Sequence, residues 1–476
     1  MLMCGISAFL DEATFKEAIE EIAMMLYSLQ HRGQEAFGIS VLSKDRKFLV
    51  MRSRHQLFSL FLKSWKKELI EKKVIGGIGH VRYSTTGSYS APSQPVLLES
   101  NDIKFSLAFN GTIANYKELD SKLARRKGEY RISPKIKNND SITLANVLYS
   151  LYIDNEKDIV EALRYLPNYV IGGYSIVVET NEPRIVIAKD PYGFRPLSYS
   201  YESGFYAASE NPALELIGKK SWKEVLPGEI VSYDGGKLER IYSERKVEPS
   251  PCLFEYVYFS RSDSVFNGIS IYDARINMGR YLAEYAPVDG DVVIPVPDSG
   301  RVIALGYSKA SGIPIEEGIV VNKYLGRGFI TPPFQRPLVT KIKYNIVEEA
   351  VRGKEVVLID DSIVRGTTMS DLVPKLKLKG AKKVHIRIGS PPYKCPCYMG
   401  IDVPTKSEVI AKNDEKVIAK MIGADSLIYN SLDNLIKAVP LRNLCHACFS
   451  CKYPFSEKSS CEYIKMLIDR GGRNEI

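Results

Sequence analysis

A run of polar residues follows an apolar stretch in the second half of the chain, and its residue types suit a phosphorylated sugar. EVVLID (355–360) is typical of a buried strand, and SIVRGTT (362–368) then opens a helix-like pattern. Ligands bind at the carboxyl ends of strands in open α/β sheets. A glycine lets the backbone approach a ligand, and a helix N-terminus attracts an anion. We therefore expect a phosphate site made by Ser362, Arg365, Gly366, Thr367 and Thr368.

Two carboxylates, Asp360 and Asp361, stand between the apolar stretch and this phosphate site. They would repel the phosphate itself, so they suit two sugar hydroxyls or a Mg²⁺ ion that holds a sugar hydroxyl. A solvated acidic turn is the plain alternative for two aspartates alone. That alternative is weak for the whole run of apolar strand, aspartate pair and phosphate site. The Walker A spacing is absent.

The whole run closely resembles the fingerprint of the type I phosphoribosyltransferases. The resemblance implies that PVPDSG (295–300) is the pyrophosphate loop, in which Asp298, Ser299 and Gly300 bind the substrate. It also implies one Mg²⁺ per subunit beside Ser299, Asp360 and Asp361. The segment from Lys323 to Lys341 is similar to the loop that closes over phosphoribosyl diphosphate in these enzymes.

Cys4 is the second candidate for chemistry, because it stands three residues from the first methionine at the start of an apolar strand. Removal of Met1–Met3 would give it a free α-amine. An α-amine with a pKa of ~7.7–8.0 can act as general base toward its own thiol. A buried structural thiol is the plain alternative for a lone cysteine in this setting.

Four motifs after Cys4 strengthen the catalytic interpretation: HRGQEAFG (31–38), GHVRYSTTG (79–87), FNGTIANY (109–116) and NNDS (138–141). Together with Cys4 they resemble the N-terminal-nucleophile glutamine amidotransferases. The resemblance implies that Arg82 binds the glutamine carboxylate and Asp140 its ammonium group. It places the oxyanion hole at the Asn110 side chain and the Gly111 N–H. The chain departs from the family at Phe109, where histidine is frequent, and at 139–142, where SDTE is frequent.

Five of the eight cysteines fall into two tight groups, Cys395 with Cys397 and Cys445 with Cys448 and Cys451. Such grouping in a chain of this length points to metal or catalysis before disulfides. The C-x₂-C-x₂-C spacing suits zinc or an iron–sulfur cluster, and unmetallated thiols are a further alternative.

The two motif sets in this order resemble the amidophosphoribosyltransferase family over nearly the whole chain. That resemblance implies synthesis of 5-phosphoribosylamine from glutamine and phosphoribosyl diphosphate, the first committed step of purine synthesis, with ammonia channelled between the sites. It implies a homo-oligomer, a tetramer or a dimer, with purine nucleotides as feedback inhibitors. It also implies a [4Fe–4S] cluster on Cys252, Cys397, Cys445 and Cys448. Cys395 and Cys451 are additional and could compete as ligands.

The elements that position these residues change in kind near Glu248–Pro251. Before it, strands with inserted helices at 15–30, 116–126 and 141–152 indicate an α+β sandwich. After it, apolar strands alternate with helical stretches at 302–310 and 368–379, which indicates a parallel α/β sheet. We expect an αββα N-terminal-nucleophile domain at 4–245, a phosphoribosyltransferase domain at 246–454 and a tail at 455–476.

Composition excludes several other classes of protein. The net charge of +9 is scattered through the 476 residues and does not form the concentrated basic patch of a nucleic-acid binder. No stretch of 18 uncharged apolar residues could span a membrane, and the short start of the chain lacks a signal peptide's basic region. We therefore expect a cytoplasmic enzyme with small-molecule substrates. The rival interpretations are another N-terminal-nucleophile amidotransferase, and a regulator that senses phosphoribosyl diphosphate.

Overall fold

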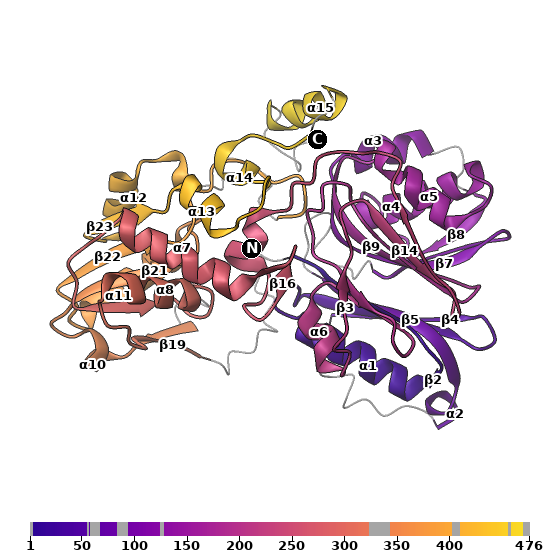
Figure 1. The fold of residues 1–476 in the computed structure, drawn as a ribbon, viewed down its shortest axis with the longest axis horizontal. Coiled ribbons are helices and arrows are strands. Elements are labelled where there is room, and N and C mark those ends of the chain that lie inside the picture. Colours follow the sequence, from indigo (N-terminus) through magenta and orange to yellow (C-terminus); the bar gives the residue numbers. More distant parts are fainter. Residues whose placement is uncertain are drawn as a thin grey trace. The chain divides into compact units, whose positions relative to one another are not determined.

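The computed structural model describes residues 3–54, 57, 67–82, 94–123, 128–322, 343–401, 410–455 and 458–469. Their fold forms two compact units (Figure 1). The first unit contains the chain up to Cys252 and also the later segments 397–404 and 455–466. The second unit contains the rest. The main segment of the first unit thus ends a few residues after the expected boundary near 245–250. The segment expected to close over the substrate, 323–341, lies outside the described residues.

The first unit contains two antiparallel sheets. One sheet has β1 (Gly5–Leu10), β2 (Ala13–Thr14), β3 (Ala36–Ser43), β4 (Phe48–Ser53), β5 (Lys73–Arg82), β11 (Ser198–Ser200), β12 (Phe205–Ala208) and β13 (Lys223–Glu224). The other has β6 (Val96–Ser100), β7 (Lys104–Ile113), β8 (Tyr130–Ser133), β9 (Gly172–Thr180), β10 (Arg184–Lys189), β14 (Glu229–Tyr233) and β15 (Leu238–Tyr242).

Helices cover the outer face of each sheet, which confirms the αββα sandwich. Figure 1 shows α1 (Phe15–Ser28) and α6 (Asn211–Leu216) along the first sheet, and their apolar residues share a core with it. The second sheet is covered by α3 (Tyr116–Lys122), α4 (Asp140–Asp154) and α5 (Ile159–Tyr165), which build another core. A third core fills the space between the two sheets. The short α2 (Lys67–Ile70) precedes β5.

Helix α1 shows how local sequence builds this layer. Thr14 accepts a hydrogen bond from the Glu17 N–H at 3.3 Å, and the Glu17 carboxylate accepts one from the Thr14 N–H at 2.8 Å. This reciprocal capping box fixes where the helix begins. The predicted apolar stripe from Phe15 to Leu26 is buried against the sheet. The expected helix at 15–30 is therefore confirmed, with its end at Ser28.

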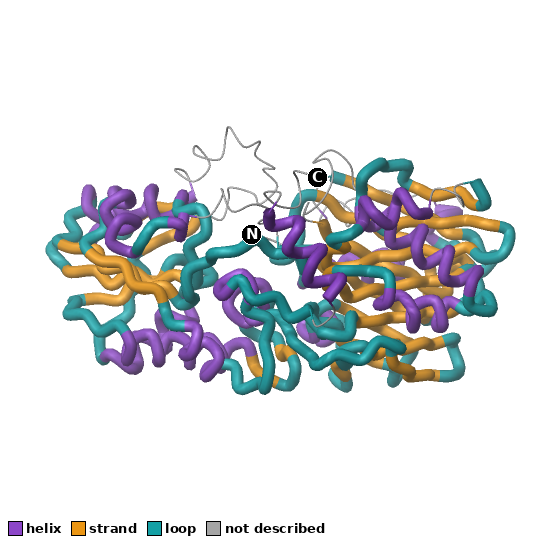
Figure 2. The backbone as a smooth tube through the Cα atoms, turned by 90° about the horizontal axis from the view of Figure 1, so that it is seen from above, coloured by secondary structure: helices purple, strands orange, loops and turns teal. Residues whose placement is uncertain are grey.

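The second unit is built on a parallel sheet in the order β18 (Val292–Pro295), β21 (Glu355–Asp360), β22 (Lys383–Ile388) and β23 (Ser426–Tyr429). Figure 2 shows helices on both sides of these strands. One face packs on α11 (Thr367–Leu378) and α12 (Glu415–Ile422), and the other on α7 (Ile271–Tyr285) and α8 (Arg301–Ser311). The predicted parallel α/β sheet is confirmed.

Smaller elements complete the described chain. There are also two short antiparallel pairs. β16 (Val265–Phe266) pairs with β17 (Ile269–Ser270) before β18 in the sequence, and β19 (Ile319–Val321) pairs with β20 (Tyr344–Ile346) between β18 and β21. The remaining helices are α10 (Glu348–Val351), α13 (Leu432–Ala438), α14 (Ala447–Ser450) and α15 (Lys458–Asp469). None of the helices in the described part of the chain is both long and apolar enough to cross a membrane.

One buried carboxyl group stands out in the first unit. Glu179 on β9 is fully buried, and neither of its carboxylate oxygens has a hydrogen-bond partner among the described residues. Burial raises the pKa of Glu179 well above its usual range. Because the folded protein holds this proton more tightly than the unfolded chain, Glu179 costs stability increasingly as pH rises above its unfolded pKa.

We predict that Glu179→Gln raises the midpoint of thermal unfolding by several degrees at pH 8 and leaves it nearly unchanged at pH 4. At pH 4 the glutamate and the glutamine at this position are both neutral. At pH 8 the glutamate ionises in the unfolded chain, but its ionisation is unfavourable in the buried apolar site, which lowers the stability of the wild type. Calorimetry at the two pH values measures this difference. Glu182→Gln, at an exposed position in the following turn, is the matched control and should change neither midpoint. A Glu179→Gln effect of equal size at both pH values contradicts the assignment.

Candidate functional site

Strand alternation gathers the predicted glutaminase residues in one layer. Ile6, Ile78 and Ala108 belong to the core between the two sheets. Residues an even number apart on a strand point to the same face. The same inner faces of β1, β5 and β7 therefore carry three predicted site residues, Cys4, Arg82 and Asn110. All three are buried, with 7%, 6% and 0% of their surfaces exposed.

Cys4 and Arg82 lie at neighbouring strand ends. The antiparallel register pairs Gly5 with Val81, so the next residues along the two strands are Cys4 and Arg82. The turn after His31 packs tightly here, because a side chain at Gly33 would come within 2.7 Å of the Arg82 carbonyl carbon. The Glu35 N–H also donates to the Arg82 carbonyl at 3.1 Å. The backbone around the expected carboxylate-binding arginine is thus fixed from two sides.

The structure adds residues to this site for which the sequence predicted no role. Arg32, fully buried, donates from Nε to the Cys4 carbonyl oxygen at 3.1 Å. Its Nη1 donates to Glu210 Oε1 at 2.6 Å, and His31 Nε2 lies 2.7 Å from the same oxygen. Glu210 follows Ser209, which exchanges two hydrogen bonds with Ile6. Arg32 and Glu210 therefore hold the start of β1 in place.

The signal for these residues was present in the sequence. Arg32 lies inside the HRGQEAFG motif (31–38), and Glu210 ends the short run ASE (208–210). The two residues are separated by 178 positions. Only the fold shows that they form one ion pair.

The second sheet contributes the predicted oxyanion hole. Both side-chain polar atoms of Asn110 on β7 are buried and lack a hydrogen-bond partner among the described residues. A buried amide without a partner is costly, which suggests that it serves a ligand. The next residue, Gly111, has φ of +151° and faces the Gly173 carbonyl so closely that a Cβ there would lie 1.9 Å from the oxygen.

Asp140 is the first residue of α4, just after β7 and β8 in the chain. Asn139 caps the helix by accepting hydrogen bonds from the Ser141 and Ile142 N–H groups at 3.1 and 3.3 Å. The Asp140 carboxylate is 5% exposed, and its Oδ2 lies 3.5 Å from the Ile113 nitrogen at the end of β7. A buried carboxylate is thereby placed at the same end of the strand as Asn110 and Gly111.

His80 is a buried, uncharged neighbour of Arg82. It lies two residues before Arg82 on β5 and is fully buried, and its Nε2 has no hydrogen-bond partner among the described residues. Burial, and next the Arg82 charge, lower the pKa of His80 to about 3. His80 is therefore neutral at physiological pH, and the positive charge at this strand end belongs to Arg82.

The second unit holds the predicted phosphoribosyl site at the carboxyl end of its parallel sheet. Asp360 ends β21, and both it and Asp361 are buried, at 6% and 3% exposure. Burial, and next the Asp361 charge, raise the pKa of Asp360 well above its usual range. Two adjacent buried carboxylates without a cation are unfavourable, so the pair fits a metal ion or sugar hydroxyls.

Two helix N-termini face this strand end. Gly300 precedes α8 and packs so closely that a Cβ would lie 2.6 Å from the Ile359 carbonyl oxygen. Gly366 precedes α11 with φ of +77°, and no side chain caps that helix. An uncapped N-terminus presents N–H groups and the positive end of the helix dipole. The structure thus brings the loops at 298–300 and 360–368 to one edge of the sheet.

The side chains of the two loops differ in exposure. Asp298 is exposed and lies 3.5 Å from the Arg301 guanidinium, while Ser299 is half-buried. Ser362 donates to the Asp361 carboxylate, and Arg365 and Thr368 are half-buried, with Thr367 exposed. All predicted residues of this site thus lie within two short segments, 298–300 and 360–368, that include the end of β21 and the start of α11.

The described cysteines differ in whether they form a disulfide. Cys395 and Cys451 form a disulfide, whereas Cys4, Cys252, Cys397, Cys445 and Cys448 are buried and outside any disulfide. The expectation that Cys395 or Cys451 could serve as a metal ligand is therefore wrong for the disulfide-bonded form. Its physical reason is that the fold places their Cα atoms 5.4 Å apart, within reach of one bond.

The surroundings of Cys397 suit a metal-bound thiolate. Its Sγ accepts hydrogen bonds from the N–H groups of Met399 and Ile401, each at 3.4 Å. The Arg195 guanidinium holds this segment by donating to the Met399 carbonyl at 2.7 and 3.1 Å. In the described part of the chain, however, no three side chains of metal-binding type lie close enough together to hold one ion.

Comparison with known proteins covers both units. A glutamine amidotransferase domain model matches residues 65–233. The amidophosphoribosyltransferase of Pyrococcus horikoshii is 42% identical, over 95% of this chain and 96% of its own. That of Bacillus subtilis is 38% identical over 90% of each chain. The chain belongs to the amidophosphoribosyltransferase family.

A solved structure supports the same assignment. The glutamine phosphoribosylpyrophosphate amidotransferase of B. subtilis, described in complex with ADP and GMP, superposes with a TM-score of 0.82 at 34% identity. It covers 95% of this chain and 97% of its own. As a member of this family, the chain is a transferase of the first step of purine biosynthesis with a glutamine amidotransferase domain. A different amidotransferase, or a regulator with one unit alone, would not match over both units.

We predict that Gly111→Ala disturbs the oxyanion strand far more than a glycine replacement at an open position. Alanine at Gly111 would have to adopt φ of +151° and also displace the Gly173 carbonyl, which costs about 2–4 kcal/mol in free energy of unfolding. Denaturant titration measures this cost. Gly128→Ala is the matched control, because φ there is +142° but nothing lies within 4 Å of the added carbon. Equal losses in the two variants would contradict the close-packing argument.

Proposed function

We propose that this chain makes 5-phosphoribosylamine from glutamine, phosphoribosyl diphosphate and water, releasing glutamate and diphosphate. The proposal rests on the family and on one observation above all. A buried Asn110 side chain without a described hydrogen-bond partner lies in the same inter-sheet layer as Cys4. An amide in that position is suited to an oxyanion that forms only during the reaction.

The glutaminase half would begin at Cys4 once residues 1–3 are removed. The freed α-amine takes the thiol proton, and the sulfur attacks the carboxamide carbon of glutamine. The Asn110 side chain and the Gly111 N–H stabilise the tetrahedral oxyanion. The α-ammonium then returns its proton to the leaving nitrogen, ammonia departs, and water hydrolyses the glutamyl thioester.

Substrate recognition would use two opposite charges, one at the end of β5 and one at the start of α4. Arg82 pairs with the glutamine α-carboxylate, because a guanidinium fork binds a carboxylate through two hydrogen bonds. Asp140 accepts the α-ammonium. Arg32 acts through Cys4, since its hydrogen bond to the Cys4 carbonyl fixes the direction in which the sulfur and the amine point.

The phosphoribosyl half would use the two loops at the strand ends. Arg365, Gly366, Thr367, Thr368 and Ser362 hold the 5′-phosphate at the N-terminus of α11. The loop 298–300 holds the diphosphate, and Asp360 and Asp361 hold the ribose hydroxyls. The buried carboxylate pair fits one Mg²⁺ together with Ser299, and the ion when bound would neutralise the charge of the departing diphosphate. Ammonia then displaces the diphosphate at the anomeric carbon.

A [4Fe–4S] cluster on Cys252, Cys397, Cys445 and Cys448 is part of the proposal. The donor chemistry fits, since these four thiols are buried and outside the disulfide, and Cys397 has the N–H donors that stabilise a thiolate. The support is therefore the type of donor and not an assembled site. The cluster when bound would act as a structural cross-link. An iron and sulfide assay on anaerobically purified protein tests it.

The remaining features of the proposal follow from the family. We propose that the enzyme is a homo-oligomer. We also propose that it acts in the cytoplasm on small-molecule substrates. A relative was solved with ADP and GMP, which supports purine nucleotides as feedback inhibitors of this chain too. Ammonia is proposed to pass from one site to the other without entering solvent.

We predict that Cys4→Ala abolishes glutamine-dependent phosphoribosylamine synthesis and keeps synthesis from added ammonium salts within about twofold. The variant lacks only the sulfur that releases ammonia. Steady-state assays with each nitrogen source give the two rates, and an intact-mass measurement shows whether Met1–Met3 are absent from the active wild type. Retention of the glutamine-dependent rate would refute the mechanism. Wild-type turnover that stops in an ammonia-trapping buffer would refute channelling.

We predict that Glu210→Gln lowers kcat for glutamine hydrolysis roughly 10–100-fold with little change in KM. The amide keeps the shape of the carboxylate but weakens the hold on Arg32, and through it on the Cys4 backbone. Ammonia-dependent synthesis should be unaffected. Glu215→Gln is the control, because Glu215 is exposed and accepts hydrogen bonds from Asn211 and Trp222 instead. A parallel loss of both activities in Glu210→Gln would indicate a merely structural role.

A further inference from the structure

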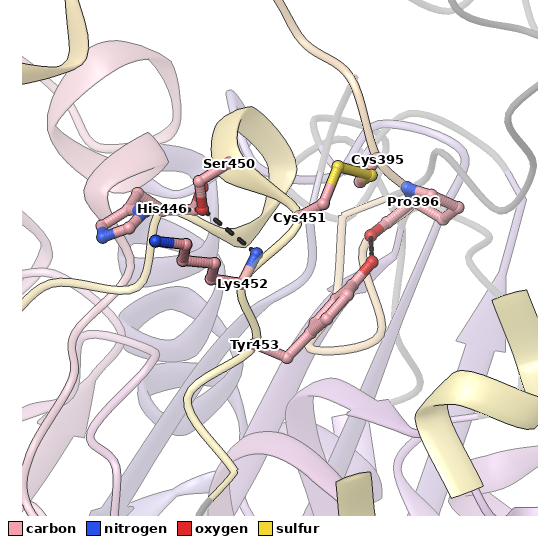
Figure 3. The surroundings of a disulfide bond; sticks show 7 residues. All are labelled: Cys395, Pro396, His446, Ser450, Cys451, Lys452 and Tyr453. Carbon is pink, nitrogen blue, oxygen red and sulfur yellow. Dashed lines mark hydrogen bonds between the residues drawn. A yellow bond between two sulfur atoms is a disulfide. The ribbon is translucent and has the colours of Figure 1, made fainter. Parts of the chain in front are cut away.

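A disulfide joins two segments that each adjoin a proposed cluster ligand. Figure 3 shows this bond between Cys395 and Cys451. In the sequence, Cys395 stands two residues before Cys397, and Cys451 stands three residues after Cys448. The bond closes a loop across 56 positions of sequence. Cys395 and Cys451 are not among the four proposed cluster ligands, and neither proposed half-reaction uses them.

Hydrogen bonds hold the same two segments together. The N–H groups of Lys394 and Cys395 both donate to the Cys448 carbonyl, at 2.7 and 3.0 Å. The Tyr453 hydroxyl donates to the Pro396 carbonyl at 2.7 Å (Figure 3). The two sulfurs are therefore kept in reach of one another by the surrounding backbone, so the bond can open and close again without a large rearrangement.

The two disulfide-bonded residues differ in exposure. Cys395 is buried, with 4% of its surface exposed, whereas Cys451 is exposed. Cys451 also ends the short α14 in the left-handed region, with φ of +61°. That conformation is unfavourable for a residue with a Cβ, and glycine is usual at this position. A cysteine there keeps a sulfur within bonding reach of Cys395 at a conformational cost.

We propose that Cys395–Cys451 is a thiol–disulfide exchange site for dithiol reductants, and that its oxidised form stabilises the segments next to the cluster ligands. The metal-related half of this inference rests on the proposed cluster. One thiolate of the reductant attacks the sulfur of Cys451, the more exposed of the two residues, the Cys451–Cys395 bond breaks, and Cys395 leaves as a thiolate that takes a proton. The second reductant thiol then displaces Cys451, so two electrons and two protons reach the protein and the reductant becomes a disulfide.

The oxidation state would determine which thiols can bind metal. In the oxidised form the grouped cysteines outside the disulfide are Cys397, Cys445 and Cys448, which with Cys252 make one set of four. Reduction adds two thiols that stand two and three residues from proposed ligands in the sequence, and it removes the covalent link across the loop. We therefore infer that the reduced protein is less stable and loses its cluster faster.

Differential alkylation tests the exchange site directly. Protein trapped in acid without reductant, then denatured and alkylated, should show Cys395 and Cys451 unlabelled by peptide mass spectrometry. Graded dithiothreitol on the native protein should make both label together. Labelling of both residues without reductant overturns the proposal, and so does resistance of the native protein to dithiothreitol.

Stability and metal retention test the consequence. Reduction should lower the unfolding midpoint of the wild type by roughly 5–15 °C, and the Cys395→Ser/Cys451→Ser double variant should show that lower midpoint with or without dithiothreitol. Anaerobic iron release to a chelator should be several-fold faster in the double variant. Equal midpoints and equal release rates overturn the stabilising role. Wild-type protein without iron refutes the proposed cluster and the metal-related half, while the alkylation result still decides the exchange site.

Discussion

The alternation of side chains along β1, β5 and β7 is the constraint on which the chemistry of the first unit depends. Each strand turns one set of side chains outward, to a helix layer, and the other inward, to the space between the sheets. A shift of one residue in any register would send Cys4, Arg82 or Asn110 to the helix side. Several features protect these registers, among them the exchange of hydrogen bonds between Ile6 and Ser209 and the close packing of Gly33 on Arg82.

Placing polar groups inside an apolar sandwich has an energetic cost that the structure distributes unevenly. Arg32 and Glu210 satisfy one another, and the pair also holds the Cys4 carbonyl. Asn110 is left without a partner in the described structure, and His80 is kept neutral by burial. The groups with satisfied hydrogen bonds thus fix the scaffold, and we propose that the unsatisfied Asn110 amide serves a charge that appears only in the transition state.

In the second unit, too, the strands determine where polar groups can stand. A parallel sheet buries its strands on both faces, so polar groups are admitted only where the strands end. Asp360 and Asp361 stand at such an end, beside the N-termini of α8 and α11. The negative pair and the positive helix ends lie at one edge, which suits a substrate with both hydroxyl and phosphate groups. In this unit Cys395 and Cys451 are covalently joined, whereas Cys445 and Cys448 stand outside the disulfide.

The sequence by itself determined the order of elements, the α+β sandwich and the parallel α/β sheet, because hydrophobic period and turn chemistry are local properties of the chain. Its short motifs predicted the residues of both candidate sites. It predicted α1 and the loop 360–368 almost to the residue. Only the tertiary structure decided which distant residues meet. The Arg32–Glu210 pair and the Cys395–Cys451 bond join positions 178 and 56 apart, and the return of the segment after Cys397 to the first unit is of the same kind. Such pairings depend on how whole layers pack, and no local pattern encodes that packing.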